Sequence, residues 1–159
     1  ARADVGALIG ADPREIVWTS GATESNNLAI KGAAYANERK GKHLVVSATE
    51  HPSVMNSVEF LEKQGWTCTR VGVTPQGMIR LDELEAASTP QTVLVAVHHG
   101  NHDIGSIQLM REVGRICTAK NVPLYVDCAR GGNRTHTALR PPDFKSGLAT
   151  SFSTRALEA

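Results

Sequence analysis

Cysteine is scarce in this chain, and its few copies form no recognisable pattern. The 159 residues include three cysteines, Cys68, Cys117 and Cys128, which is an odd number without a C-x-x-C pair. This spacing argues against a disulfide framework and is typical of a protein kept in a reducing compartment. We therefore expect a cytoplasmic location.

The chain also lacks a long hydrophobic run and an excess of charge of either sign. No apolar run approaches the roughly 20 residues that span a bilayer, and no signal-peptide pattern is present. The 17 basic and 16 acidic side chains leave a net charge of +1. We expect neither a membrane nor a nucleic acid as a partner. The chain begins without an initiator Met and in helical character, from which we expect a truncated N-terminus.

What is present is an alternation of short apolar runs with helix-like segments in a chain that is 41% hydrophobic. We expect helices at 1–8, 24–39, 53–64, 81–87 and 107–120, and strands at 15–19, 43–47, 67–73, 92–97 and 122–126. The run TVLVAV at 92–97 is typical of a strand covered on both faces. The alternation predicts an α/β fold with a mainly parallel sheet and flanking helices.

The character of the chain changes after Cys128. Residues 129–159 carry five basic and two acidic side chains, the pairs Gly-Gly and Pro-Pro, and apolar residues without a helix or strand period. We therefore predict a division into residues 1–128, the folded part, and 129–159, an atypical tail. An unrelated sequence joined by a frameshift, a disordered basic tail and an unusual continuation of the fold all remain open.

The stretch from Glu15 to Ala33 predicts an anion site. Its apolar run meets the small-residue turn Ser20-Gly21-Ala22-Thr23, which opens into a helix. Free backbone N–H groups and the positive end of the helix dipole attract a phosphate at such a corner. No Lys or Arg lies between Arg14 and Lys31, so backbone and hydroxyl groups would do most of the binding. The alternative is an ordinary connection between a strand and a helix.

Three further strand ends carry groups of chemical interest. They are Thr49-Glu50-His51, the segment from His98 to Asp103, and Asp127. Parallel strands would bring these groups and the anion corner to one rim of the sheet. The set suits an aromatic cofactor that bears a phosphate, with its ring against His51 and a protonated ring nitrogen bonded to Asp127.

Each of these residues also has a purely structural interpretation. His51 precedes a proline and is suited to open the next helix, while Asp103 and Asp127 are suited to cap a turn or helix. Glu50 is expected to be a surface carboxylate under this interpretation. Only the joint pattern favours a cofactor site.

A metal-dependent hydrolase is a further alternative, because imidazole and carboxylate groups are zinc and iron ligands. Its ligands would come from His98, His99, His102, Asp103 and Asp127. His98 and His99 are adjacent and would point to opposite faces of a strand, which weakens a shared site. We therefore predict no metal ligands.

Four motifs, in order and at matching spacing, resemble the large domain of the cysteine desulfurases. They are EIVWTSGATESNNLAIKGAA, SATEHPSV, HHGNHDIGSIQ and LYVDC. These enzymes belong to the class V aminotransferase group of pyridoxal-phosphate enzymes, fold type I. The resemblance covers residues 1–127, and it implies an incomplete large domain of that fold.

The resemblance also implies a cofactor and roles for five residues. Pyridoxal 5'-phosphate would be held at its phosphate by Ala22 and Thr23, while His51 would stack on the ring as the candidate catalytic residue. Asp127 would pair with the ring nitrogen, which must stay protonated for the cofactor to act as an electron sink. His102 stands where the family has an Asn near the ring hydroxyl.

The family activity implied is transfer of sulfur from L-cysteine to an acceptor protein, leaving alanine. Related expectations are a homodimer and a place in iron–sulfur cluster assembly. However, Arg130 replaces the family's Gln, and the segment from Ser151 to Arg155 lacks the His and Lys that normally form the Schiff-base motif. No cysteine matches the sulfur-accepting position. We expect a fragment that is inactive alone, or a non-catalytic pseudoenzyme of the same fold.

Overall fold

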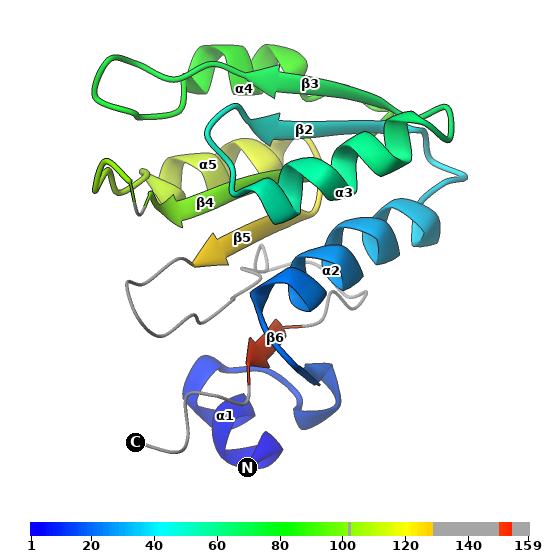
Figure 1. Ribbon diagram of the computed structural model, residues 1–159, viewed down its shortest axis with the longest axis vertical. Coiled ribbons are helices and arrows are strands. Elements are labelled where there is room, and N and C mark those ends of the chain that lie inside the picture. The colour runs from blue at the N-terminus through cyan, green and yellow to red at the C-terminus, as the bar shows by residue number, and fades with distance from the viewer. Residues whose placement is uncertain (102, 129–149, 154–159) are drawn as a thin grey trace.

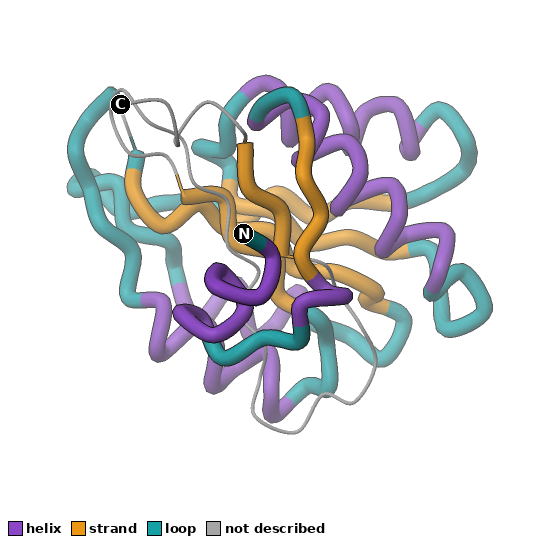
Figure 2. The backbone as a smooth tube through the Cα atoms, turned by 90° about the horizontal axis from the view of Figure 1, so that it is seen from below, coloured by secondary structure: helices purple, strands orange, loops and turns teal. Residues whose placement is uncertain are grey.

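The main structural unit is a four-stranded parallel sheet with helices on both faces (Figures 1 and 2). The computed structural model describes residues 1–101, 103–128 and 150–153. The strand order is β3-β2-β4-β5, and every pair is parallel. Its strands are β2 (His43–Ser47), β3 (Thr67–Val71), β4 (Thr92–Gly100) and β5 (Leu124–Cys128). The predicted α/β fold with a mainly parallel sheet is confirmed.

Two helices cover each face of this sheet. They are α2 (Ala22–Ala36) and α3 (Pro52–Glu62) on one face, and α4 (Leu81–Ala87) and α5 (Met110–Ala119) on the other. Alternate residues of each strand enter opposite cores: Leu44 and Val46 pack with α2 and α3, whereas Val45 packs with α4 and α5. This explains why the apolar run of β4 is continuous, since both of its faces are buried.

The first strand of the chain lies outside the main sheet, contrary to the expectation that all strand ends share one sheet edge. Strand β1 (Ile16–Thr19) pairs in parallel with β6 (Thr150–Ser153) in a separate two-stranded sheet. This small sheet and α1 (Arg2–Ile9) lie at one end of the molecule, below α2 in Figure 1. Strand β6 belongs to the tail, where the sequence shows no strand period. The boundary at residue 128 stays a prediction.

Several element boundaries depend on pairing between strands. Strand β4 continues three residues beyond the predicted 97, because His98 pairs with Asp127 and Gly100 pairs with Cys128. Pairing with β5 thus keeps residues 98–100 in the strand, although their polar composition favours a loop. The first helix ends as expected at Gly10, which adopts the left-handed conformation with φ of 69°. Helix α4 has the predicted bounds.

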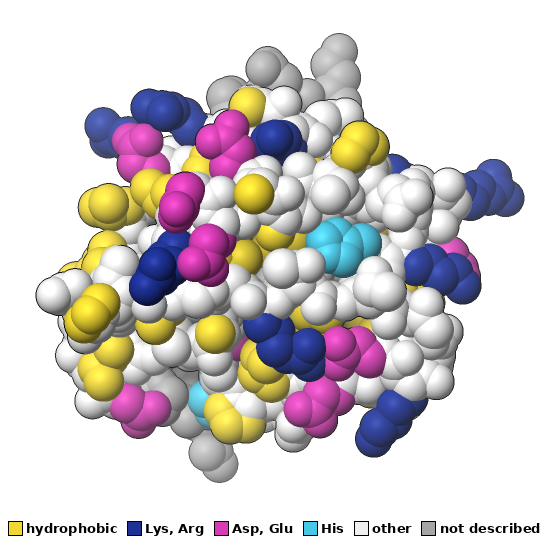
Figure 3. All heavy atoms as spheres, turned by 90° about the horizontal axis from the view of Figure 1, so that it is seen from above, with side chains coloured by type: hydrophobic (Ala, Val, Ile, Leu, Met, Phe, Trp, Pro, Cys, Tyr) yellow, Lys and Arg dark blue, Asp and Glu magenta, His cyan; other side chains and the backbone are white. Residues whose placement is uncertain are grey.

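Acidic and basic side chains are mixed with apolar ones on the face of the molecule above α4 and β3 (Figure 3). This mixture agrees with the net charge of +1. Among the described residues, no helix combines the length and the apolar character needed to cross a membrane.

Candidate functional site

Asp127 is buried at the carboxyl end of β5 and is oriented by a residue from α2. Its side chain is 4% exposed, and its Oδ2 accepts a hydrogen bond of 3.0 Å from Asn26 Nδ2. Asn26 is fully buried. Its Nδ2 also donates to Ser53 Oγ at 2.7 Å, and its Oδ1 accepts a hydrogen bond from the Tyr125 hydroxyl. Asp127 therefore lies within β5 and is not the cap of a helix.

His51 lies at the start of α3 and is held by Ser53. Its Nδ1 accepts the Ser53 backbone N–H at 3.2 Å and lies 2.7 Å from Ser53 Oγ. His51 therefore does open the next helix, as its structural interpretation expects. Ser53 Oγ also accepts from Asn26, so its hydroxyl proton is directed to His51 Nδ1. An unbroken series of hydrogen bonds thus joins His51 to Asp127 through Ser53 and Asn26.

The predicted anion corner lies on the same helix as Asn26. Helix α2 begins at Ala22, and its N-cap Gly21 gives no side-chain capping bond. Free N–H groups of the first turn are available in such a helix. Ala22 is buried and Thr23 is exposed. Residues four apart share one face of a helix, so Ala22 lies one turn from the residue that contacts Asp127.

Glu50 is a buried residue, and the expectation of a surface carboxylate is wrong. Its Oε1 accepts two hydrogen bonds from His98, one of 2.6 Å from the backbone N and one of 2.9 Å from Nδ1. The Glu50 side chain is 0% exposed and that of His98 is 4% exposed. Burial raises the pKa of Glu50, the bonds from His98 lower it, and the charge of Asp127 raises it again.

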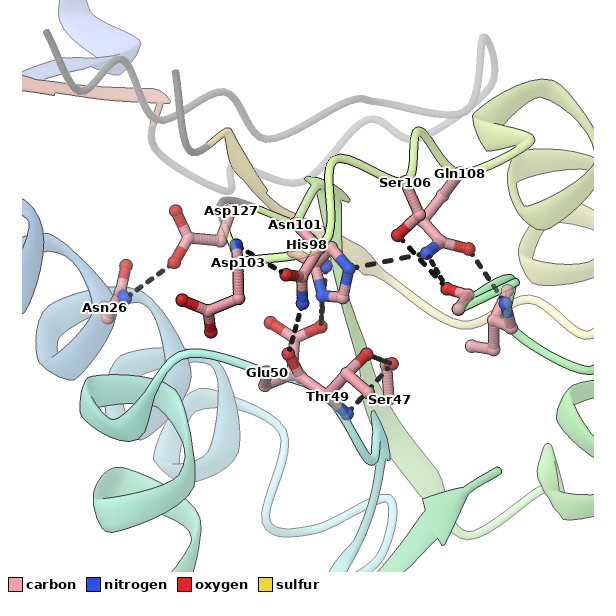
Figure 4. A network of polar contacts seen from close by, with 12 residues as sticks. Asn26, Ser47, Thr49, Glu50, His98, Asn101, Asp103, Ser106, Gln108 and Asp127 are labelled. Carbon is pink, nitrogen blue, oxygen red and sulfur yellow. Dashed lines mark hydrogen bonds and ion pairs between the residues drawn. The ribbon is translucent and has the colours of Figure 1, made fainter. Parts of the chain in front are cut away.

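The loop after β4 contacts the turn after β2. Asn101 Nδ2 donates to the Thr49 carbonyl at 3.4 Å, while its Oδ1 accepts the Asp103 backbone N–H at 2.9 Å (Figure 4). Asp103 is exposed and belongs to a turn, as its structural interpretation predicts. His102, the predicted neighbour of a ring hydroxyl, lies outside the described residues.

The metal-site alternative finds no support in the part of the chain that is described. His98 is buried and bonded to Glu50, whereas His99 is exposed. Within residues 1–101 and 103–128, no group of three or more His, Cys, Asp or Glu side chains has a geometry that suits a metal ion.

The cysteines of the described core are structural. Cys68 lies in β3 and Cys117 is buried in α5, and both thiols are free. Burial raises the pKa of Cys68 and of Cys117 to about 12. Neither is suited to act as a thiolate nucleophile near neutral pH.

Three residues of the site escaped the sequence prediction: Asn26, Ser53 and Tyr125. The only local signal is the position of Asn26, one turn after the small-residue corner. Its partners lie 27, 99 and 101 residues away in the chain. Burial of a polar side chain among such distant partners is visible only once the fold is known.

Comparison with known proteins identifies the family. The profile of the Aminotransferase class-V family matches residues 1–140. The chain belongs to the class-V aminotransferase family. Within this family it is 50% identical over 130 residues to the cysteine desulfurase IscS of Neisseria meningitidis, a match that covers 82% of this chain and 32% of that relative. It is 48% identical over 149 residues to the IscS of Methylobacillus flagellatus, covering 92% of this chain and 37% of that one.

Solved structures of class-V aminotransferase relatives agree with this assignment. A NifS-like protein has a TM-score of 0.77 and 32% identity, covering 81% of this chain and 36% of its own. DndA from Streptomyces lividans has a TM-score of 0.76 and 35% identity, covering 82% of this chain and 37% of its own. The chain spans about a third of the length of these relatives.

Proposed function

We propose that this chain is part of a pyridoxal-phosphate-dependent cysteine desulfurase. The hydrogen-bonded series from Asp127 through Asn26 and Ser53 to His51 carries this proposal. It gathers a buried carboxylate, an imidazole and the start of α2 at one place. These are the groups that a phosphorylated pyridine ring requires.

Asp127 is the residue that would hold the ring nitrogen. A buried carboxylate favours a protonated, positively charged partner. The Asn26 bond orients this carboxylate, and the burial of both side chains excludes water from the contact. When bound, pyridoxal phosphate supplies an electron sink at the substrate carbon.

His51 and the first turn of α2 would hold the remainder of the cofactor. Ser53 bonds to His51 Nδ1 from its backbone and its hydroxyl, which fixes the imidazole in one orientation and places the ring proton on Nε2. This fixed imidazole suits a ring stacked against it. The backbone N–H groups of Ala22 and Thr23, with the Thr23 hydroxyl, suit the phosphate.

The substrate and partners follow from the relatives and belong to the same proposal. Several relatives are cysteine desulfurases, and one solved relative, SspA, is in complex with cysteine. We accordingly propose L-cysteine as the substrate, a protein thiol as the sulfur acceptor, a homodimer, and a cytoplasmic role in iron–sulfur cluster assembly. His102 would contact the ring hydroxyl.

We further propose that the 159-residue chain does not turn over L-cysteine by itself. Three of the five lysines in the described part contact other groups: Lys31 lies 4.1 Å above the Phe60 ring, Lys40 donates to the Asn121 carbonyl, and Lys42 pairs with Glu38. A site that lacks the Schiff-base lysine would hold the cofactor non-covalently, as in a pseudoenzyme.

Pyridoxal phosphate titration of the chain tests the cofactor site. We expect saturable binding, seen as a change in the cofactor's absorbance, that borohydride does not make permanent. Asp127→Asn should weaken it about tenfold or more, because a charge-assisted contact is lost. Asp82→Asn, at the exposed start of α4, is the matched control and should bind as the unmodified chain does.

Two results would contradict this proposal. Equal affinities of Asp127→Asn and Asp82→Asn for pyridoxal phosphate would refute a cofactor contact at Asp127. Release of alanine from L-cysteine by the chain alone, at a normal enzymatic rate, would refute the claim that it does not turn over.

A further inference from the structure

Glu50 connects two neighbouring strand ends through a single oxygen. Its Oε1 accepts both the backbone N–H and the Nδ1–H of His98, at 2.6 and 2.9 Å. Glu50 belongs to the turn after β2, whereas His98 lies near the end of β4. A carboxylate that accepts two bonds from one residue restrains both the backbone and the side chain of that residue. We call this contact the Glu50–His98 clamp.

The protonation of His98 follows from its other neighbour, Gln108. The Gln108 Oε1 accepts the Ile79 backbone N–H at 2.8 Å, and its Nε2 donates to the Gly77 carbonyl at 2.8 Å. This fixes the amide orientation, so the group that faces His98 Nε2 at 3.4 Å is a donor. His98 Nε2 must then be an acceptor. The imidazole is neutral, with its proton on Nδ1 directed to Glu50.

The clamp lies between the two residues proposed to hold the cofactor ring. Glu50 is directly followed by His51, and His98 is the register partner of Asp127 on the adjacent strand. In the sheet order, β4 separates β2 from β5. Figure 4 shows Glu50, His98 and Asp127 gathered at this edge of the sheet. The clamp therefore joins the turn that carries His51 to the strand position paired with Asp127.

The second oxygen of Glu50 carries no structural bond. Among the described residues, Glu50 Oε2 is the one buried side-chain polar atom without a hydrogen-bond partner. An unsatisfied buried polar atom is costly. The clamp needs one acceptor oxygen, which a neutral carboxyl or an amide supplies equally well. Burial raises the pKa of Glu50, and the bonds from His98 lower it.

We propose that Glu50 is a positioning residue of the cofactor site, which sets the placement of His51 against Asp127 by clamping His98. This inference rests on the proposed function. Glu50 acts through the acceptor oxygen Oε1 and not through its charge. It touches neither the substrate nor the cofactor's reacting atoms.

Two substitutions of Glu50 separate the acceptor oxygen from the charge. In Glu50→Ala the clamp is lost, and pyridoxal phosphate binding to the 159-residue chain should weaken about tenfold or more. The circular dichroism band that a fixed orientation induces in the bound cofactor should disappear. In Glu50→Gln the acceptor is retained, and both affinity and band should return to within about twofold of the unmodified chain. Glu59→Ala, on the exposed side of α3, is the control.

The tautomer of His98 tests the clamp in the unmodified chain, with or without cofactor. Nitrogen-15 NMR at pH 7 should show a neutral ring protonated at Nδ1. Protonation at Nε2 would refute the clamp, even if Glu50→Ala fails to fold. Unchanged binding in Glu50→Ala, or loss in Glu50→Gln as large as in Glu50→Ala, would refute the positioning role. Failure of the unmodified chain to bind pyridoxal phosphate would instead refute the proposed function.

Discussion

Replacement of Asn26 by Ala removes the residue that connects the site. Asn26 is fully buried and bonds to Asp127, Ser53 and Tyr125. The alanine leaves a carboxylate and two hydroxyl groups in a dry interior without these partners. A buried group that loses its partner costs more than the bond itself contributes.

The magnitude follows from the three bonds. The bond to the Asp127 carboxylate is worth about 1.5 to 3 kcal/mol and each neutral bond about 1 kcal/mol. Alanine recovers roughly 0.6 kcal/mol through its higher helix propensity. The net loss is about 3 to 4 kcal/mol, a large part of the roughly 5 to 15 kcal/mol that stabilises an ordinary domain.

Urea unfolding followed by tryptophan fluorescence measures this loss. Asn27→Ala is the matched control, because Asn27 neighbours Asn26 but its side-chain bonds to described residues, to the Thr23 carbonyl and Lys31, stay within its own helix. Its free energy of unfolding should change by less than about 1 kcal/mol. Tyr125→Phe removes one of the three bonds and should cost about 1 kcal/mol. Equal losses for Asn26→Ala and Asn27→Ala would refute the claim that Asn26 connects the site.

Three other expectations concern packing, thiol reactivity and pH. A Cβ on Gly41 would lie 2.7 Å from Gln91 Cα, so Gly41→Ala should lower the free energy of unfolding, measured by urea titration, by about 1 to 3 kcal/mol. Gly32→Ala in α2 is the comparison: its added Cβ meets no atom within 4 Å, so the free energy of unfolding should rise slightly. Cys117 should resist Ellman's reagent at pH 8 until the chain unfolds, because burial raises the pKa of its thiol to about 12. Rapid labelling of Cys117 in the folded chain would contradict this expectation. Burial lowers the pKa of His43 from its usual 6.5 in the folded chain. As the pH falls from about 7 to 5, the unfolded chain therefore binds a proton before the folded chain does, and the free energy of unfolding should decrease. Thermal melts of His43→Gln should lack this contribution to the pH dependence.

Local patterns predicted most of the main sheet. The apolar run of β4 indicated burial on both faces, and the proline after His51 indicated the start of α3. Such features depend on neighbours in the sequence, where periodicity and the restrictions of proline act directly. The bounds of β2 and α4 were correct for this reason.

Features that depend on distant partners were missed. Glu50 was expected at the surface, because nothing near it in the chain reveals a partner 48 residues away. The placement of β1 depends on β6, which comes from a segment without a strand pattern. The sequence therefore pointed to His51 and Asp127 as candidates, but it did not reveal Asn26 and Ser53, the buried residues that join them by hydrogen bonds.

The most direct test of the common cofactor site is an NMR titration of the nitrogen-15-labelled chain with pyridoxal phosphate. The shifts should concentrate at the amides of Ala22, Thr23, His51 and Asp127, and they should saturate with a single dissociation constant. Residues on the far edge, such as those of β3, should not move. Shifts confined to one of the four positions, or spread evenly over the surface, would contradict a single site built from α2, α3 and β5.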